Sequence, residues 1–267
     1  MNDTNHLMNA VFVDTHTHLF LPEFNNDRHE TVQRAIDHGV KAMFLPNVDT
    51  ETIDQVFKLA DAFPAHCFPM AGLHPESVHE DFEEKLIEIE KLITKKNIYG
   101  IGETGLDYYW DLTYKEQQKA SFDCQLKMAI KYQLPAVIHV RNSFDDVIEI
   151  VQQNASFGLT GIFHCFTGTV KEAEKIISLG FYLGIGGVVT FKNGGLDKVI
   201  PEVPLENIVL ETDSPFLSPV PHRGKRNESS YVIHVAEKIA LLKDIPLEEV
   251  AQITTQNAVK LFKFELK

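Results

Sequence analysis

Cysteine and long apolar runs are both scarce in this 267-residue chain, and their scarcity excludes several classes of protein. The three cysteines, Cys67, Cys124 and Cys165, contain no C-x-x-C spacing, so neither a disulfide framework nor a thiolate zinc site is predicted. No apolar stretch is long enough to cross a bilayer, and the polar first ten residues, without Lys or Arg, do not resemble a signal peptide. We therefore expect a cytoplasmic protein with reduced thiols and no membrane partner.

Positive charge is also in short supply. The chain has 25 Lys and Arg against 38 Asp and Glu, a formal net charge of −13. This balance argues against a protein that coats nucleic acid through a basic face. It does not exclude a local positive site, because bound divalent cations dominate the charge of their surroundings.

The chain further lacks a linker, since it has no Gly/Ser tract, Pro-rich spacer or long run of charge. We therefore predict a single domain over residues 1–267. A barrel of parallel strands and helices typically needs ~250 residues, so this length suffices for one. The sequence does not predict an oligomeric state, and it is compatible with a monomer.

Short apolar or β-branched runs recur along the chain and alternate with segments of helical period or composition. Eight such runs lie near residues 11–14, 41–45, 67–72, 98–102, 135–139, 160–164, 181–185 and 207–211. This alternation predicts an α/β protein with a parallel sheet covered by helices, and eight units favour a closed (β/α)8 TIM-type barrel. The seventh unit is the weakest, because the run Leu183–Val189 is followed by only a short helical piece.

Residues able to bind a metal ion stand immediately after five of these runs. They are His16, His18, Glu103, His139, His164 and Asp213. Unpaired ionisable groups are costly to bury, so five strand ends that all deliver imidazole or carboxylate are poorly explained as core filling. In a parallel barrel such groups meet at one end, where we predict that they bind one or two divalent cations.

Each of these residues has its own chemistry and its own simpler explanation. His16 and His18 are two apart, so on an extended strand they face the same side and can bind one ion together. Glu103, as a carboxylate, can bridge two ions, and Asp213 can bind a metal while accepting the proton of a water molecule. Taken singly, the histidines could be surface or core residues, Glu103 a solvated loop residue and Asp213 a cap.

Three further residues are predicted to contact a substrate. His74 in A-G-L-H-P can donate to an anionic oxygen, although a turn histidine would fit equally well. Arg141 can bind a phosphate with two N–H groups, and an ion pair with Asp145 or Asp146 is the competing explanation. Arg223 lies in H-R-G-K-R-N, the only dense basic cluster of the sequence, and can bind a phosphate. The competing explanation is that this cluster is a solvated loop without a ligand. Aromatic side chains from Tyr108 to Trp110 either stack on bases or pack as loop core.

Taken together, the motifs of the chain resemble the TatD-like deoxyribonuclease family of metal-dependent hydrolases. They are V-D-T-H-T-H-L, G-L-H-P-E, G-I-G-E-T-G-L-D-Y, H-V-R, H-C-F-T-G, L-E-T-D-S-P-F-L-S-P and R-G-K-R-N-E. The resemblance covers nearly the whole chain. It implies a (β/α)8 barrel with a two-metal site and hydrolysis of DNA, often from the 3′ end.

The resemblance also implies a role for each residue. His16, His18 and Asp213 would bind one ion. His139 and His164 would bind the other. Glu103 would bridge the two ions, and His74, Arg141 and Arg223 would approach the substrate.

We therefore predict a phosphodiesterase that acts on a single-stranded DNA end through two-metal activation of water, with Glu103 and Asp213 as its catalytic carboxylates. Mg²⁺ or Mn²⁺ suits turnover, and four histidines also favour Zn²⁺. The alternative is an amidohydrolase or esterase, including an aminoacyl-ester deacylase, that uses the same barrel site. A metal-binding scaffold without turnover is a further alternative.

Overall fold

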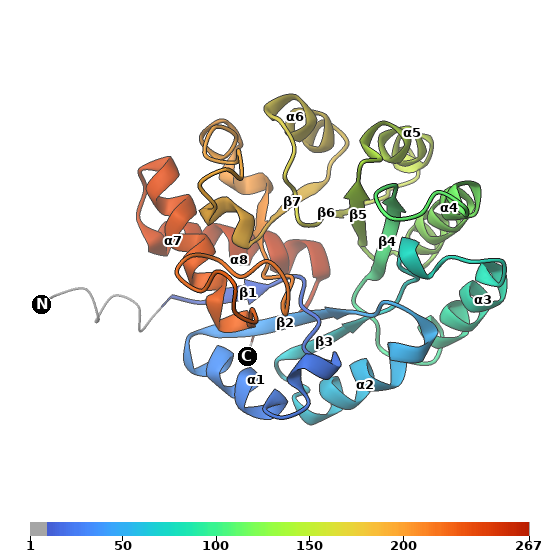
Figure 1. The fold of residues 1–267 in the computed structure, drawn as a ribbon, viewed down its shortest axis with the longest axis horizontal. Helices are drawn as coiled ribbons and strands as arrows, with labels where there is room; N and C mark the ends of the chain where they lie inside the picture. Colours follow the sequence, from blue (N-terminus) through green and yellow to red (C-terminus); the bar gives the residue numbers. More distant parts are fainter. Residues whose placement is uncertain (1–9, 267) are drawn as a thin grey trace, which may run out of the picture.

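Eight parallel strands surround a common axis in the computed structural model, which describes residues 10–266 (Figure 1). The strands are β1 Phe12–Asp14, β2 Val40–Pro46, β3 Cys67–Met70, β4 Ile101–Asp107, β5 Ala136–Arg141, β6 Gly161–Phe163, β7 Tyr182–Ile185 and β8 Ile208–Leu210. They pair in chain order within two groups, β1 to β3 and β4 to β8.

Backbone hydrogen bonds join these two groups into a barrel. Between β8 and β1, the amide of Thr15 donates to the carbonyl of Leu210 at 2.9 Å. Between β3 and β4, the amide of Ala71 donates to Gly100 at 3.1 Å, and that of Gly102 donates to Ala71 at 3.0 Å. The predicted (β/α)8 barrel is confirmed.

Helices cover the outside of the strands (Figure 1). They are α1 Arg28–Asp37, α2 Ile53–Ala62, α3 Phe82–Ile93, α4 Lys115–Tyr132, α5 Phe144–Ala155, α6 Val170–Ser178, α7 Val232–Lys243 and α8 Leu247–Phe262. Each amphipathic helix buries its apolar side, as α3 does with Leu86, Ile89 and Ile93. None of the helices in residues 10–266 combines the length and the apolarity that a membrane span requires.

The seventh unit has no α-helix of its own in the described chain. Short 3₁₀ helices, Gly187–Thr190 and Ile200–Glu202, follow β7 instead, and α7 packs against both. The glycine-rich run after Leu183 does not favour a helix, which explains the weak helical signal there.

The end of the barrel where the strands begin is filled by an aromatic plug, formed by Phe44, Phe68, Phe262 and Phe264. The rings of Phe44 and Phe262 stack with centroids 3.9 Å apart. Helix α8 crosses this end, since Asn257 donates from Nδ2 to the carbonyl of Ile208 at 2.7 Å. The opposite end, where the strands finish, carries the polar residues.

Candidate metal centre

The alternation of side chains along β5 and β6 directs two predicted ligands into the barrel. Val137 and Ile162 belong to the interior core, and His139 and His164 follow each of them by two residues. Residues two apart on a strand face the same side, so both imidazoles point to the interior.

Glu103 lies at the middle of the cluster, with one carboxylate oxygen on either side. Oε2 lies 3.2 Å from Nε2 of His16 and 3.4 Å from Nε2 of His18. Oε1 lies 2.7 Å from Nε2 of His164 and 2.9 Å from Nδ1 of His139. The side chain is only 4% exposed. Glu103 therefore has imidazoles on both sides, and the two groups adjoin where the rings of His16 and His164 stack with centroids 4.0 Å apart.

The first group contains His16, His18 and Asp213. Nε2 of His16 and Nε2 of His18 are 3.1 Å apart, and Oδ1 of Asp213 lies 3.7 and 3.5 Å from them. These three ligand atoms all lie within 4.8 Å of one another, which is close enough for one ion to contact them together. The structure thus brings the His-x-His pair and Asp213 together across the β8–β1 seam.

The second group contains His139 and His164, and Asp107 fixes the orientation of one of them. Nε2 of His139 lies 2.9 Å from Oδ2 of Asp107, so in the neutral ring Nε2 carries the proton and donates it to that carboxylate. Nδ1 then presents a lone pair to the negatively charged Oε1 of Glu103 at 2.9 Å. Two lone pairs repel at this distance unless a proton or a cation lies with them, and carboxylate-bound imidazoles are typical metal ligands. The residues therefore fit a divalent cation.

The pKa shifts in the cluster also indicate a demand for positive charge. Burial raises the pKa of the Glu103 carboxyl, but the charges of His164, His74 and His16 outweigh it and hold that pKa well below its usual value. Burial lowers the pKa of His18, yet its hydrogen bonds with Asp213 and Glu103 bring that pKa up to about 9. A buried carboxylate that stays ionised beside imidazoles is an environment that favours bound cations.

His74 also reaches the cluster, although not from a strand. It precedes the 3₁₀ helix Pro75–Ser77, and its Nε2 lies 3.3 Å from Oε1 of Glu103. Nδ1 accepts a hydrogen bond from the amide of Glu76 at 3.1 Å, so the proton of the neutral ring is on Nε2. His74 is therefore arranged as a hydrogen-bond donor toward the centre rather than as a ligand.

Two buried carboxylates support the cluster from behind. Asp14 accepts from Oγ1 of Thr212 at 2.6 Å and from the amide of His16 at 3.3 Å, which ties β1 to the end of β8. Glu211 accepts from the amide of Cys165 at 2.6 Å and lies 3.8 Å from Nδ1 of His164. Asp14 stands directly before T-H-T-H, Asp107 four residues after Glu103 and Glu211 two residues before Asp213, but nothing in the sequence distinguishes them from other carboxylates near a predicted ligand.

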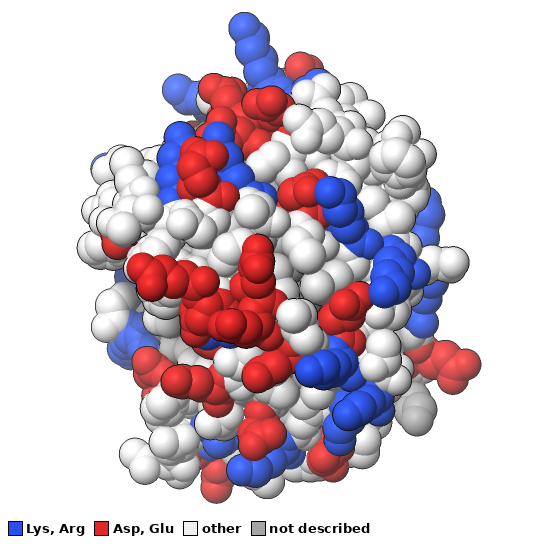
Figure 2. Space-filling view, turned by 90° about the vertical axis from the view of Figure 1, so that its right-hand side faces the viewer, with Lys and Arg blue, Asp and Glu red and all other residues white. Residues whose placement is uncertain are grey.

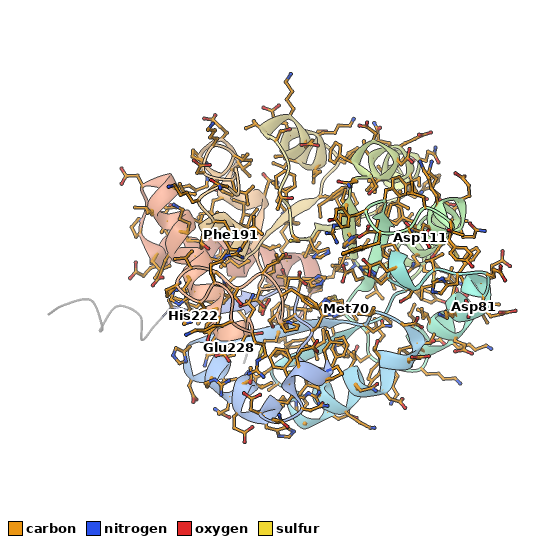
Figure 3. The ribbon with its side chains drawn as sticks, in the orientation of Figure 1. Met70, Asp81, Asp111, Phe191, His222 and Glu228 are labelled. Carbon is orange, nitrogen blue, oxygen red and sulfur yellow. The ribbon has the colours of Figure 1, made fainter. Side chains whose placement is uncertain are left out.

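The two arginines predicted to approach substrate lie outside the cluster, on different loops. Arg141 lies over the ring of Tyr109, with its guanidinium carbon 3.9 Å from the centroid, and Arg223 lies over Phe191 at 3.7 Å. Figure 3 labels Phe191 and, across the barrel opening, Asp111 of the loop after β4. Within residues 10–266, neither arginine forms an ion pair.

Neighbouring charges explain why. Asp146, the competing partner for Arg141, lies 2.8 Å from Nζ of Lys119 and 3.3 Å from Nζ of Lys115 instead. In the basic cluster, Arg226 binds Asp27 with two hydrogen bonds of 2.7 Å and so holds the loop in place. Arg223 remains available to a ligand.

The chain is similar to known metal-dependent hydrolases over most of its length. The family described as TatD related DNase matches residues 13–263, a range that contains all six clustered residues. The uncharacterized metal-dependent hydrolase YabD of Bacillus subtilis is 40% identical over 254 residues, 95% of this chain and 99% of that protein. The 3′-5′ ssDNA/RNA exonuclease TatD of Edwardsiella piscicida is 31% identical over 247 residues, 90% of this chain and 95% of its own.

Solved structures agree with the sequence comparison. The crystal structure of YjjV, a TatD homolog from Escherichia coli K12, has a TM-score of 0.89 and 29% identity, covering 95% of this chain and 98% of the other. The phosphotriesterase homology protein of Escherichia coli, solved with phosphate in its active site, has a TM-score of 0.66 and 12% identity and covers 95% and 99%. At that identity the likeness shows a shared barrel fold alone.

Proposed function

Because the chain belongs to the TatD-related DNase family and is a metal-dependent hydrolase, we propose that it hydrolyses phosphodiester bonds of single-stranded DNA from the 3′ end. One observation carries the proposal: the Glu103 carboxylate faces one group of imidazoles with each of its oxygens. Such a bridge suits two ions acting on one phosphate. A relative named as a 3′-5′ ssDNA/RNA exonuclease supports the substrate class.

In this proposal, His16, His18 and Asp213 would hold one divalent cation. His139 and His164, whose ring nitrogens Nδ1 and Nε2 lie 3.3 Å apart, would hold the other, and Glu103 would serve both. When bound, the two cations, Mg²⁺ or Mn²⁺ for turnover with Zn²⁺ also suited to imidazole, would lower the pKa of water and neutralise charge on the phosphoryl oxygens.

The remaining chemistry belongs to side chains of the chain itself. Asp213 is 14% exposed at the opening, whereas the His16 side chain is fully buried, so Asp213 is accessible to the attacking water and accepts its proton. His74 donates from Nε2 to a phosphoryl oxygen, and Arg141 and Arg223 bind phosphates of the strand. Asp107 keeps the lone pair of His139 directed at the centre.

End-labelled oligonucleotides test this function. We expect single-stranded DNA to be shortened stepwise from the 3′ end with Mg²⁺ or Mn²⁺ and to survive in chelator. A parallel assay on amide, lactone and aminoacyl-ester substrates tests the alternative hydrolase. Turnover of those substrates with intact DNA would overturn the nuclease proposal, and bound metal without any turnover would indicate a scaffold.

A matched pair of variants assigns the activity to the centre. Glu103→Gln keeps the shape of the side chain but removes the charge between the two groups of imidazoles. Glu90→Gln makes the same change on the surface of α3, where Glu90 pairs with Lys131 at 2.8 Å. Activity should be lost in the first variant and kept in the second.

A further inference from the structure

The loop after β4 exposes two large aromatic side chains at the barrel opening. Tyr109 is 53% exposed and Trp110 is 67% exposed. Their neighbour Tyr108 is half-buried and donates its hydroxyl to Asp146 at 2.8 Å. The sequence allowed these aromatic rings either to pack within the loop or to stack on a base. Tyr108 packs within the loop, whereas the exposed surfaces of Tyr109 and Trp110 are available to a ligand.

Arg141 completes this surface. Its guanidinium carbon lies 3.9 Å from the centroid of Tyr109 and 5.3 Å from that of Trp110, and the two rings meet edge to face at 4.7 Å. The stacking fixes the guanidinium plane, and no side-chain hydrogen bond or ion pair of Arg141 occurs within the described part of the chain. Its N–H groups are thus positioned but unused, the arrangement that binds phosphate well.

The aromatic loop is attached to the metal centre through one carboxylate. Asp107 accepts from Nε2 of His139 through Oδ2 at 2.9 Å and from the amide of Tyr109 through Oδ1 at 2.9 Å. Trp110 and Asp107 also line a cavity of about 230 Å³ beside the centre, together with His79 and Tyr114. Asp107 thus lies between this cavity and His139 and connects a ligand at Trp110 to the metal centre.

We propose that Trp110, Tyr109 and Arg141 form a subsite for one unpaired nucleotide beside the scissile bond. Trp110 stacks on the base, and Arg141 binds the adjoining phosphate. The inference rests on the proposed function and explains a choice of single strands, because a base inside a duplex has no free face for Trp110. Stacking on an aromatic ring is tolerant of sequence, so no base preference is expected.

Trp110 reports on its own surroundings, since it is the only tryptophan of the chain. The protein, with its bound metal, is titrated with oligothymidylate whose phosphorothioate linkages resist hydrolysis. We expect saturable quenching of tryptophan fluorescence by the oligonucleotide and none by inorganic tripolyphosphate. Absent quenching, or equal responses to both probes, would overturn the base contact.

Kinetics on hydrolysable oligonucleotides give a second readout. Trp110→Ala should raise KM roughly fivefold or more while kcat stays within about twofold, and Trp110→Phe should restore most of the loss. Phe157→Ala is the matched control: Phe157 is also 67% exposed, but it follows α5 at the end where the strands begin. Its KM should equal that of the unmodified protein.

The possible failures are distinguishable. If the protein degrades oligonucleotides and the KM of Trp110→Ala equals that of Phe157→Ala, the proposed function stands and the subsite is refuted. If the protein degrades no oligonucleotide with any divalent cation, the proposed function is refuted, and so is the subsite, which depends on it.

Discussion

Asp107 is not one of the six clustered residues, yet its carboxylate determines which nitrogen of His139 presents a lone pair to Glu103. Without it, the proton of the neutral ring is free to move to Nδ1, and the lone pair toward Glu103 is lost. We expect Asp107→Ala to weaken metal binding and to lower hydrolysis by roughly 10- to 100-fold, the usual effect of removing such a partner. Calorimetric metal titration and initial rates measure the two effects.

The control for this variant lies in the same loop. Asp111→Ala also removes a carboxylate, but the partners found for Asp111 within residues 10–266 are its neighbours in the loop, including the amide of Thr113 at 2.8 Å, and not an imidazole of the centre. Metal affinity should be unchanged in Asp111→Ala. Equal losses in the two variants would show that Asp107 acts through the loop rather than through His139.

At the scale of elements, the sequence predicted the barrel well and its fourth strand less well. Helix α4 spans Lys115–Tyr132, as its composition indicates, whereas the strand expected near 98–102 is Ile101–Asp107. The full length of this strand is not evident from the sequence, because the polar residues Glu103 and Asp107 interrupt its apolar run. They are tolerated inside it since both carboxylates find imidazole partners.

Candidate ligands were predictable because strand ends of a barrel share one edge. The supporting contacts were not, since they join residues far apart in the chain, as Glu211 joins Cys165 and Asp14 joins Thr212. The metal roles of the six residues and the single domain over 1–267 stay predictions.

The approach of β4 to β5 requires glycine at position 105. Gly105 has φ of 141°, and a Cβ atom there would lie 2.0 Å from the carbonyl oxygen of His139. We expect Gly105→Ala to reduce the free energy of unfolding by about 3 kcal/mol or more, through backbone strain and the separation of the two strands. Urea denaturation followed by circular dichroism measures it.

Gly158→Ala separates strain from crowding. Gly158 also has positive φ, 83°, but nothing lies within 4 Å of its virtual Cβ. Its replacement should cost only about 1 kcal/mol. A similar loss in both variants would contradict a special role for close packing beside His139.

Asp146, in the first turn of α5, accepts a hydrogen bond from Tyr108 at the start of the aromatic loop. Hydrogen bonds with Lys119 and Tyr108 outweigh burial and lower the pKa of Asp146 to about 2. An unfolded Asp has a pKa of roughly 3.9, so the interaction stabilises the fold above that pH and is lost as pH falls through about 2. Asp146→Asn should cost about 0.5–1 kcal/mol at pH 7.

Urea denaturation at several pH values tests the sign of this effect. The difference in free energy of unfolding between the unmodified protein and Asp146→Asn should shrink between roughly pH 4 and pH 2. Asp145→Asn removes the same charge from the same turn of α5, where Asp145 is exposed, and should show a smaller difference. A difference that grows on acidification would refute the assignment.

At the scale of the whole molecule, negative charge outweighs positive charge, and some of it lies near the opening, where Glu76 lines the same cavity as Trp110. The side of the barrel that includes α3 displays a concentration of acidic residues (Figure 2). Exposed members near α3 are Glu76, Glu80, Asp81, Glu83, Glu84 and Glu88. With a net charge of −13, the surface repels a phosphate backbone, and Arg141 and Arg223 are the cations we assign to the strand.

This distribution predicts a shallow dependence of binding on salt. Two arginine–phosphate contacts correspond to a slope of roughly −1.4 for log K against log salt on single strands. Arg141→Ala and Arg223→Ala should each reduce its magnitude by about 0.7. Lys260→Ala, on α8 at the far end, should leave it unchanged. Fluorescence titrations at several salt concentrations measure the slope, and a much steeper value would indicate a wider basic contact.

The aromatic plug has a consequence for how a polymer is consumed. Phe44, Phe68, Phe262 and Phe264 obstruct the base of the barrel, so a polynucleotide has no tunnel through which to travel. The interior of the barrel is therefore open at one end only. If the chain degrades single strands as proposed, each released nucleotide has to leave on the side from which the strand enters, and we therefore expect repeated release and rebinding of the strand rather than continuous threading.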